Sequence, residues 1–279
     1  MNAEKKRQLE RFALSIRKET IRMIGHLGVG HVGGALSICD VLAVLYGGVM
    51  RVDPQFPKSA ERDWLVVSKG HAGPAVYAAL ALRGFFPLEQ LITLNQLGTN
   101  LPSHCDMNRT PGIDMTTGSL GQGASSAAGI ACGNRIKGLA NYTYLITGDG
   151  ESEEGQIWEA ALFAAQHKLT HLIAFVDYNK AQIDGSIAEV CDLGDMAAKY
   201  TQFGWYAQCV NGHDVAAIWD AIERAKAQSD RPSVIVLDTI KGHGVSFVAG
   251  KISSHNMTLS PEQTADAIAE LDLQLQQLG

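Results

Sequence analysis

Cysteine, proline and long runs of one charge are scarce in this sequence. Its 279 residues include 5 cysteines and 8 prolines. The cysteines are scattered, odd in number and never in a C-x-x-C pair, so we expect reduced thiols and a cytoplasmic location rather than a disulfide framework. The net charge is −6 without a long basic run, which gives no reason to expect a nucleic-acid partner. A net negative charge is still compatible with a locally basic or histidine-rich pocket that binds an anion.

Long hydrophobic runs are also missing. No apolar stretch reaches about 18 residues, so we expect neither a membrane span nor a membrane partner. The N-terminal segment MNAEKKRQLERF is charged and has no apolar core behind it, unlike a secretory signal. The composition, 46% hydrophobic and 19% charged, is typical of a folded globular chain.

Short apolar runs alternate with helical patterns along the chain. Strands are expected at 64–68, 142–147, 172–177 and 233–238, with a weaker one at 205–210. Helices are expected at 4–26, 36–46, 73–83, 87–95, 121–138, 152–168 and 214–228. This alternation predicts an α/β fold with a mostly parallel central sheet and helices on both faces. Ligands of such sheets bind at the carboxyl ends of the strands.

A last helix is expected at about 260–278. Ser260 as cap, Pro261 in the first turn and Gln263 make a capping box. The sequence shows no internal repeat, low-complexity segment or flexible linker. We therefore expect residues 1–279 to form one domain.

An early glycine pattern imitates a dinucleotide fingerprint. Gly28, Gly30 and Gly33 match G-x-G-x-x-G, and Asp53 follows at the distance of a ribose-binding acid. The fingerprint needs a strand directly before it, whereas a charged, helix-like segment stands here. An NAD-dependent oxidoreductase is therefore disfavoured against a glycine-rich turn between two helices.

Two apolar strands end in residues that suit a cation. The strand at 142–147 leads into Asp149, flanked by glycines, and the strand at 172–177 leads into Asn179. Adjacent parallel strands would bring these two side chains together. A carboxylate, an amide oxygen and a backbone carbonyl are hard ligands for Mg²⁺ or Ca²⁺, and phosphate oxygens would complete the octahedron. Asp149 alone is also compatible with a turn or helix-cap residue.

Four of the nine histidines lie in loop-like contexts: His31, His71, His104 and His255. A single histidine is more often a surface residue than a functional one. Because the loops of an α/β chain gather at one sheet edge, these four can converge. Imidazoles, neutral or cationic near pH 7, suit a site that handles phosphates, hydroxyls and protons.

Six blocks occur in a fixed order: GHVGGALS (30–37), SKGHAG (68–73), TTGSLGQG (116–123), GDGESEEG (148–155), DYNKAQIDG (177–185) and DTIKGHG (238–244). Together they resemble the N-terminal, diphosphate-binding part of transketolase over essentially the whole chain. The resemblance implies a thiamine diphosphate-binding (PP-type) fold, with thiamine diphosphate and Mg²⁺ (or Ca²⁺) as cofactors. It implies transfer of a two-carbon ketol unit from a ketose to an aldose. One departure is Lys180 after Asn179, where the motif often has a second asparagine.

The resemblance also implies roles for single residues. His31 and His104 would contact substrate hydroxyls, Lys241 the diphosphate, and Glu154 would couple cofactor sites across a dimer interface. The implied catalytic residues are His31, His71, His104, His255 and Glu154. The implied cofactor contacts are His71, Gly118, Leu120, Asp149, Gly150, Asn179, Lys241 and His255. The implied metal ligands are Asp149, Asn179 and the carbonyl of Ala181.

The family also uses a second α/β domain, which supplies the glutamate that activates the cofactor. No such domain follows here within 279 residues. The sequence therefore resembles the N-terminal subunit of a split transketolase. We expect it to act on sugars or sugar phosphates with a separate C-terminal, pyrimidine-binding subunit, as a heterotetramer.

Three alternatives stay open. A 2-oxoacid dehydrogenase α subunit or a deoxyxylulose-phosphate synthase would also carry the metal motif. The SKGHAG and TTGSLGQG blocks and His104 favour transketolase over both. A non-catalytic binding module that keeps the site is the third.

Overall fold

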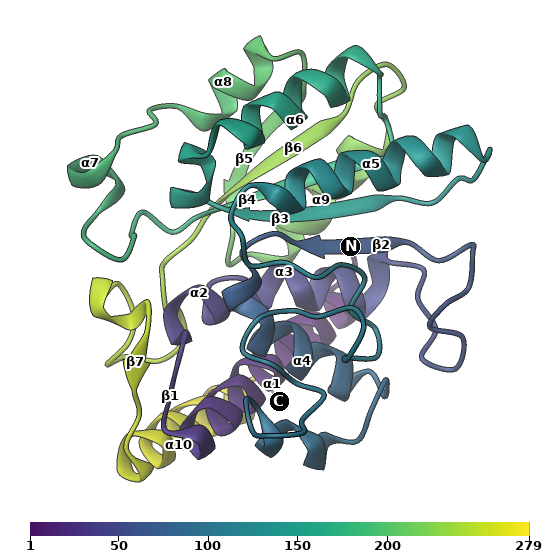
Figure 1. The fold of residues 1–279 in the computed structure, drawn as a ribbon. Helices are drawn as coiled ribbons and strands as arrows, with labels where there is room; N and C mark the ends of the chain where they lie inside the picture. The colour runs from purple at the N-terminus through teal and green to yellow at the C-terminus, as the bar shows by residue number, and fades with distance from the viewer. Residues whose placement is uncertain (279) are drawn as a thin grey trace.

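A five-stranded parallel sheet forms the centre of the molecule (Figure 1). The computed structural model describes residues 1–278. The strand order is β2-β3-β4-β6-β5, and every neighbouring pair is parallel. The strands are β2 (Trp64–Val67), β3 (Thr143–Gly148), β4 (Leu172–Tyr178), β5 (Tyr206–Asn211) and β6 (Ser233–Asp238). The predicted α/β fold is confirmed, and the weak strand at 205–210 is β5.

Helices cover both faces of the sheet, because the central strands carry apolar side chains on both sides. One face packs on α5 (Gln122–Ile136), α6 (Gly155–Gln166) and α8 (Met196–Gln202). The other packs on α1 (Ala3–Leu27), α3 (Cys39–Val44), α4 (Gly73–Leu82) and α9 (Val215–Lys226). Along β4, Phe175 joins the second core and Ala174 the first, as the alternation of a strand requires.

The last helix, α10 (Pro261–Gln277), lies along α1 (Figure 1). Its predicted capping box is present: Ser260 Oγ accepts from Gln263 N, and Gln263 Oε1 accepts from Ser260 N. The two helices approach closely at Gly25, where an added Cβ would lie 2.3 Å from Thr264 Oγ1. Glycine at this position therefore allows the contact.

Several predicted helices are shorter or divided. The helix expected at 36–46 becomes α2 (Val32–Leu36), α3 and the π-helical turn η1 (Leu45–Val49). The helix expected at 152–168 begins with the 3₁₀ turn η4 (Gly150–Glu153), and the one at 87–95 is the 3₁₀ segment η3 (Leu88–Thr93). The sequence pattern did not indicate β1 (Val29–Gly30) and β7 (Met257–Thr258), which pair antiparallel, nor α7 (Ile187–Val190), η2 (Gly70–Ala72) and η5 (Ile252–Ser254). These elements are too short for hydrophobic periodicity to show them.

The expectation that no apolar stretch reaches 18 residues was wrong. The window Val32–Val49 is long and apolar enough to pass a membrane-span test by length and composition. In the fold, 89% of this window is buried. A core helix of a globular protein passes the same test, so this window is only weak support for a membrane span.

Candidate functional site

The carboxyl ends of β3 and β4 bring together the two residues expected to bind a metal. The strands pair with Gly148 opposite Asp177, so the loops after them run side by side. Asp149 Oδ2 accepts a hydrogen bond from Lys180 N at 2.5 Å, and Asn179 Oδ1 accepts one from Ala181 N at 3.2 Å. Both acceptor side chains are buried. Carboxylate, amide and carbonyl oxygens thus lie at one edge of the sheet.

The departure at Lys180 has a conformational consequence. Its φ is +68°, in the left-handed region that non-glycine residues rarely adopt. Asparagine tolerates this region better than lysine because its short side chain can bond locally. This backbone conformation gives a physical reason for the asparagine that the usual motif has at the position of Lys180. Asn179, the residue expected to bind a metal, is present.

A cavity of about 230 Å³ opens above these loops. Its wall includes ten residues of the recognised blocks or their neighbours: His71, Leu120, Asp149, Gly150, Glu154, Asn179, Ala181, Gln182, Lys241 and His255. Lys241 Nζ donates to the Ala181 carbonyl at 2.9 Å and lies 3.1 Å from His255 Nδ1. Burial lowers the pKa of Lys241 to about 8, although the nearby carboxylate of Asp149 acts in the opposite direction and raises it. The wall therefore combines hard oxygen ligands with an amine suited to an anion.

The four loop histidines converge beside this cavity. Ring centroids of His31 lie 5.3 Å from His71, 5.6 Å from His104 and 5.5 Å from His255. The pairing of β1 with β7 holds the loop of His31 next to that of His255. The structure thus brings together the four histidines singled out from the sequence, although His31 and His104 do not line the cavity itself.

The imidazoles of this cluster favour the neutral form. Burial, with the nearby Lys69 ammonium, lowers the pKa of His71 to about 2. Burial and Lys241 lower the pKa of His255 to about 4. Burial also lowers the pKa values of His31 and His104. At pH 7 the cluster therefore offers neutral donors and acceptors rather than fixed cations, which suits contacts to hydroxyl groups.

The TTGSLGQG loop forms another side of the site. Gly118 has a φ of +143°, and an added Cβ would lie 2.9 Å from His104 Cδ2, so glycine permits this approach. Leu120 and Glu154 are exposed at the cavity wall. Gly118 itself lies away from that wall, against His104.

A buried carboxylate that the sequence pattern did not single out lies behind the site. Asp177 is fully buried at the end of β4. It accepts hydrogen bonds from Lys69 Nζ at 2.6 Å, Ser37 Oγ at 2.7 Å, Asn179 Nδ2 at 2.8 Å and Thr239 Oγ1 at 2.5 Å. By holding the Asn179 amide nitrogen, it fixes which way that side chain faces. The signal that could have pointed to Asp177 is an aspartate at the end of an apolar strand inside a recognised block.

Glu151 is a second buried carboxylate that was missed. It accepts from the Ser68 hydroxyl, from Gly121 N at 2.9 Å and from Gly148 N at 2.9 Å. These donors belong to three of the blocks that carry the resemblance. Glu151 therefore ties the three loops together under the cavity.

The early glycine pattern does not build a dinucleotide site. The element before Gly28 is the 25-residue helix α1, and the two-residue β1 that follows belongs to the small sheet. Asp53 lies in a turn, where its Oδ1 accepts from Gln55 N. The strand that the fingerprint requires is therefore absent from this part of the described chain.

Comparison with known proteins decides the family. The sequence profile described as "Transketolase, thiamine diphosphate binding domain" matches residues 9–277. The chain belongs to the transketolase family. It corresponds to the thiamine diphosphate-binding, N-terminal part, as the six blocks predict.

Relatives of this transketolase chain match it from end to end. The 6-deoxy-6-sulfo-D-fructose transketolase subunit SqwG of Clostridium sp. (strain MSTE9) is 57% identical over 270 residues, which cover 97% of this chain and 98% of that protein. One subunit of the apulose-4-phosphate transketolase of Phocaeicola vulgatus is 36% identical over 262 residues, covering 94% of this chain and 93% of that protein. The predicted resemblance to the N-terminal subunit of a split transketolase is confirmed.

Solved transketolases share the fold. The Pichia stipitis enzyme in complex with sedoheptulose 7-phosphate superposes with a TM-score of 0.86 at 31% identity, over 97% of this chain and 45% of that one. The Campylobacter jejuni enzyme gives a TM-score of 0.86 at 28% identity, over 100% of this chain and 48% of that one. This transketolase chain therefore spans about half the length of these solved relatives.

Proposed function

We propose that this chain is the thiamine diphosphate-binding subunit of a transketolase that transfers a two-carbon ketol unit from a ketose to an aldose. It acts with a separate subunit that supplies the pyrimidine-binding half of the site, in a heterotetramer. The observation that carries the proposal is the cavity wall, where Asp149, Asn179 and Lys241 face one space beside four histidines. The end-to-end match to two proteins called transketolase subunits supports the partner.

The oxygen ligands fit a small divalent cation. Asp149 Oδ, Asn179 Oδ1 and the Ala181 carbonyl are the hard donors that Mg²⁺ prefers, and they leave positions for diphosphate oxygens. Burial and the Asp177 carboxylate raise the pKa of Asp149 to about 6, so a bound cation would also relieve repulsion between these carboxylates. We propose Mg²⁺ here, with Ca²⁺ as the alternative.

The other residues of this chain bind and orient. Thiamine diphosphate, when bound, supplies the electron sink for cleavage of a carbon–carbon bond. Lys241, His71 and His255 would hold its diphosphate, with Gly118, Leu120 and Gly150 against the rest of the cofactor. His31 and His104 would donate to or accept from substrate hydroxyls. Glu154, exposed at the cavity rim, would contact a neighbouring subunit.

The names of two relatives support a proposal for the substrate class. One relative belongs to a 6-deoxy-6-sulfo-D-fructose transketolase, and another belongs to an apulose-4-phosphate transketolase. We propose a ketose donor with an anionic end, with the sulfosugar favoured by the 57% identity. We further propose that the chain works in the cytoplasm as one domain, without nucleic-acid or membrane partners.

The test is reconstitution. The chain is mixed with its partner subunit, thiamine diphosphate and Mg²⁺, and assayed with a panel of sulfonated and phosphorylated ketoses and aldose acceptors. Turnover that needs both subunits supports the proposal. Full turnover by this chain alone, or none from the mixture with any sugar, contradicts it.

Matched variants locate the cation in the same complex. Asp149→Asn removes the carboxylate at the site, whereas Asp220→Asn makes the same chemical change at an exposed position of α9. We expect only the first to abolish Mg²⁺-dependent binding of thiamine diphosphate in calorimetry. Equal binding by both variants would contradict this metal site.

A further inference from the structure

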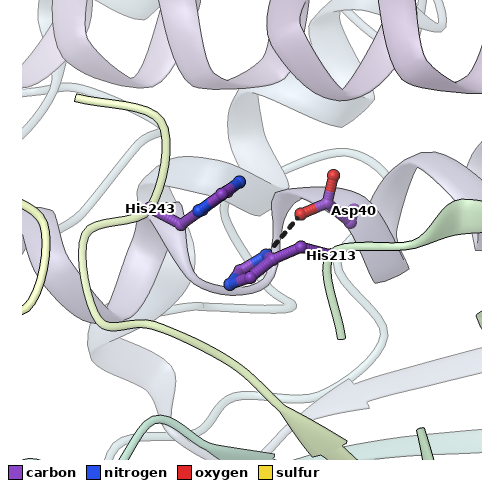
Figure 2. A group of neighbouring side chains, drawn as sticks. All are labelled: Asp40, His213 and His243. Carbon is purple, nitrogen blue, oxygen red and sulfur yellow. Dashed lines mark hydrogen bonds and ion pairs between the residues drawn. The ribbon is translucent and has the colours of Figure 1, made fainter. Parts of the chain in front are cut away.

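A second cluster of ionisable side chains lies outside the cavity, where β5 and β6 end (Figure 2). Asp40 comes from α3, His213 from the loop between β5 and α9, and His243 from the loop after β6. Their ligand atoms all lie within 4.8 Å of one another. By composition, one carboxylate and two imidazoles suit a transition metal.

The geometry excludes a metal ion shared by the two imidazoles. The rings of His213 and His243 are stacked, with centroids 3.6 Å apart and planes inclined by 14° (Figure 2). A metal bound by an imidazole nitrogen lies in the ring plane, about 2.0–2.1 Å from that nitrogen. One ion cannot lie in both of two nearly parallel planes at this spacing. The Asp40 carboxylate is moreover paired with the buried Arg17 guanidinium.

Both nitrogens of His213 are already engaged. Ile240 N donates to His213 Nε2 at 2.8 Å, and His213 Nδ1 lies 2.9 Å from Asp40 Oδ2. Because Nε2 accepts a hydrogen bond, it carries no proton, so Nδ1 is the protonated nitrogen and donates to Asp40. The carboxylate therefore fixes the ring so that its acceptor faces one backbone amide.

That amide belongs to the residue before Lys241. The side chain of Ile240 is 46% exposed, so packing of this side chain does little to hold the backbone. On either side, Thr239 Oγ1 donates to Asp177, and Gly242 N donates to Gly33 O at 3.0 Å. Between these two points the Ile240 carbonyl accepts from His243 N at 3.1 Å and the Lys241 carbonyl from Gly250 N at 2.8 Å. His213 supplies the acceptor for the Ile240 amide.

Arg17 completes the arrangement from α1. Its Nη2 group pairs with Asp40, and its Nε donates to the His243 carbonyl at 3.2 Å. We propose that Arg17, Asp40 and His213 are positioning residues, which fix the backbone at Ile240 and so hold the Lys241 ammonium toward an anionic group in the cavity. This inference rests on the proposed function, in which that group is the diphosphate of the cofactor.

The test compares three variants in the complex with the partner subunit, by calorimetric titration of thiamine diphosphate and Mg²⁺. His213→Phe keeps the ring and removes the acceptor, and we expect roughly three- to tenfold weaker binding from the loss of this hydrogen bond. In His213→Gln the side-chain oxygen can take the place of the histidine Nε2 as acceptor for the Ile240 amide. This variant should bind the cofactor within about twofold of the unsubstituted complex. His243→Phe, the control, keeps the stacked ring and should bind like the unsubstituted chain.

A Lys241→Met variant shows whether His213 affects cofactor affinity through Lys241. If His213 acts through Lys241, adding His213→Phe to Lys241→Met causes no further loss of affinity. An equal loss in both backgrounds overturns the inference, as does a His213→Phe complex that binds as tightly as the unsubstituted one. Should His213→Phe fail to fold, His213→Asn replaces it, because its short amide reaches Asp40 but not Ile240.

Amide exchange separates this inference from the proposed function. In the chain without cofactor, the Ile240 amide should exchange faster with deuterium in His213→Phe than in His243→Phe. Unchanged protection of that amide overturns the positioning role. Failure of the unsubstituted complex to bind thiamine diphosphate overturns the proposed function instead, whatever the exchange shows.

Discussion

Lys69 Nζ lies 2.6 Å from Asp177 Oδ2, and both side chains are almost completely buried. Burial alone would raise the pKa of Asp177, but the Lys69 ammonium and the Ser37 and Thr239 hydroxyls bring its pKa below the usual range. The carboxylate in turn holds the amide nitrogen of Asn179. The pair therefore supports both the sheet edge and the orientation of a proposed metal ligand.

Lys69→Met should destabilise the fold strongly. The substitution leaves a buried carboxylate without its ion partner, which costs about 3–5 kcal/mol of unfolding free energy. Urea unfolding measures the loss. Arg231→Met breaks an exposed pair with Asp230 and should change the unfolding free energy little, because solvent screens such a pair. Similar losses in the two variants would contradict the importance of the buried pair.

Glu151→Gln should loosen the junction of three loops. The amide group of glutamine would face a backbone donor, Gly121 N or Gly148 N, that the carboxylate now satisfies. A buried donor left without its acceptor costs about 1–3 kcal/mol. Urea unfolding should show this loss, whereas Glu159→Gln, on an exposed position of α6, should change little. A silent Glu151→Gln variant would contradict the role of this carboxylate.

Asp114 should make stability fall as pH rises from about 4 to 6. Burial raises its pKa to about 6, although Arg62 Nη1 lies 2.7 Å away and lowers it. The unfolded carboxyl titrates near 3.9. Between these values the folded chain binds more protons than the unfolded chain, so the contribution of this group to the unfolding free energy decreases with rising pH.

Asp114→Asn isolates that contribution. The amide oxygen can still accept from Leu65 N, which now bonds to the carboxylate at 2.8 Å. The unfolding free energy of the original chain minus that of the variant should drop by at most about 3 kcal/mol between pH 4 and pH 7. Asp220→Asn, at an exposed carboxylate, is the control. Parallel stability curves for the original chain and Asp114→Asn would refute the prediction.

His104→Ala should slow turnover of the complex more than it weakens cofactor binding. His104 packs against Gly118 and His31 but does not line the cavity wall of Asp149 and Lys241. A side chain that gives or takes a proton at the reacting substrate typically contributes 10²- to 10⁴-fold in rate, so in that role the loss of His104 should lower kcat roughly 100-fold. Steady-state kinetics and thiamine diphosphate titration measure the two effects. A collapse of cofactor affinity with turnover retained at saturation would refute the role of His104.

The sequence predicted β2, β3, β4 and β6 well because these strands are mostly buried, whereas the more exposed β5 gave a weaker signal. Runs such as Leu172–Tyr178 are almost continuously apolar, as expected for a strand that is covered on both faces. Gly-Asp-Gly after one strand and Asn after the next mark the edge of the sheet where the site lies. The helix boundaries were less predictable. One helix was expected at 36–46, yet α2 ends at Leu36, the chain turns at Ser37 and Ile38, and α3 begins at Cys39.

Local sequence thus determined the strands, the loops that follow them and the types of ligand that those loops carry. Tertiary structure alone decided the rest, because the remaining contacts join residues far apart in the chain. Asp177 binds Lys69 across 108 residues, and His213 accepts from Ile240 only after both strand ends reach the same edge. Burial at that edge also made the histidines neutral. A buried charge needs a partner, and which partner it meets depends on strand order rather than on neighbouring sequence.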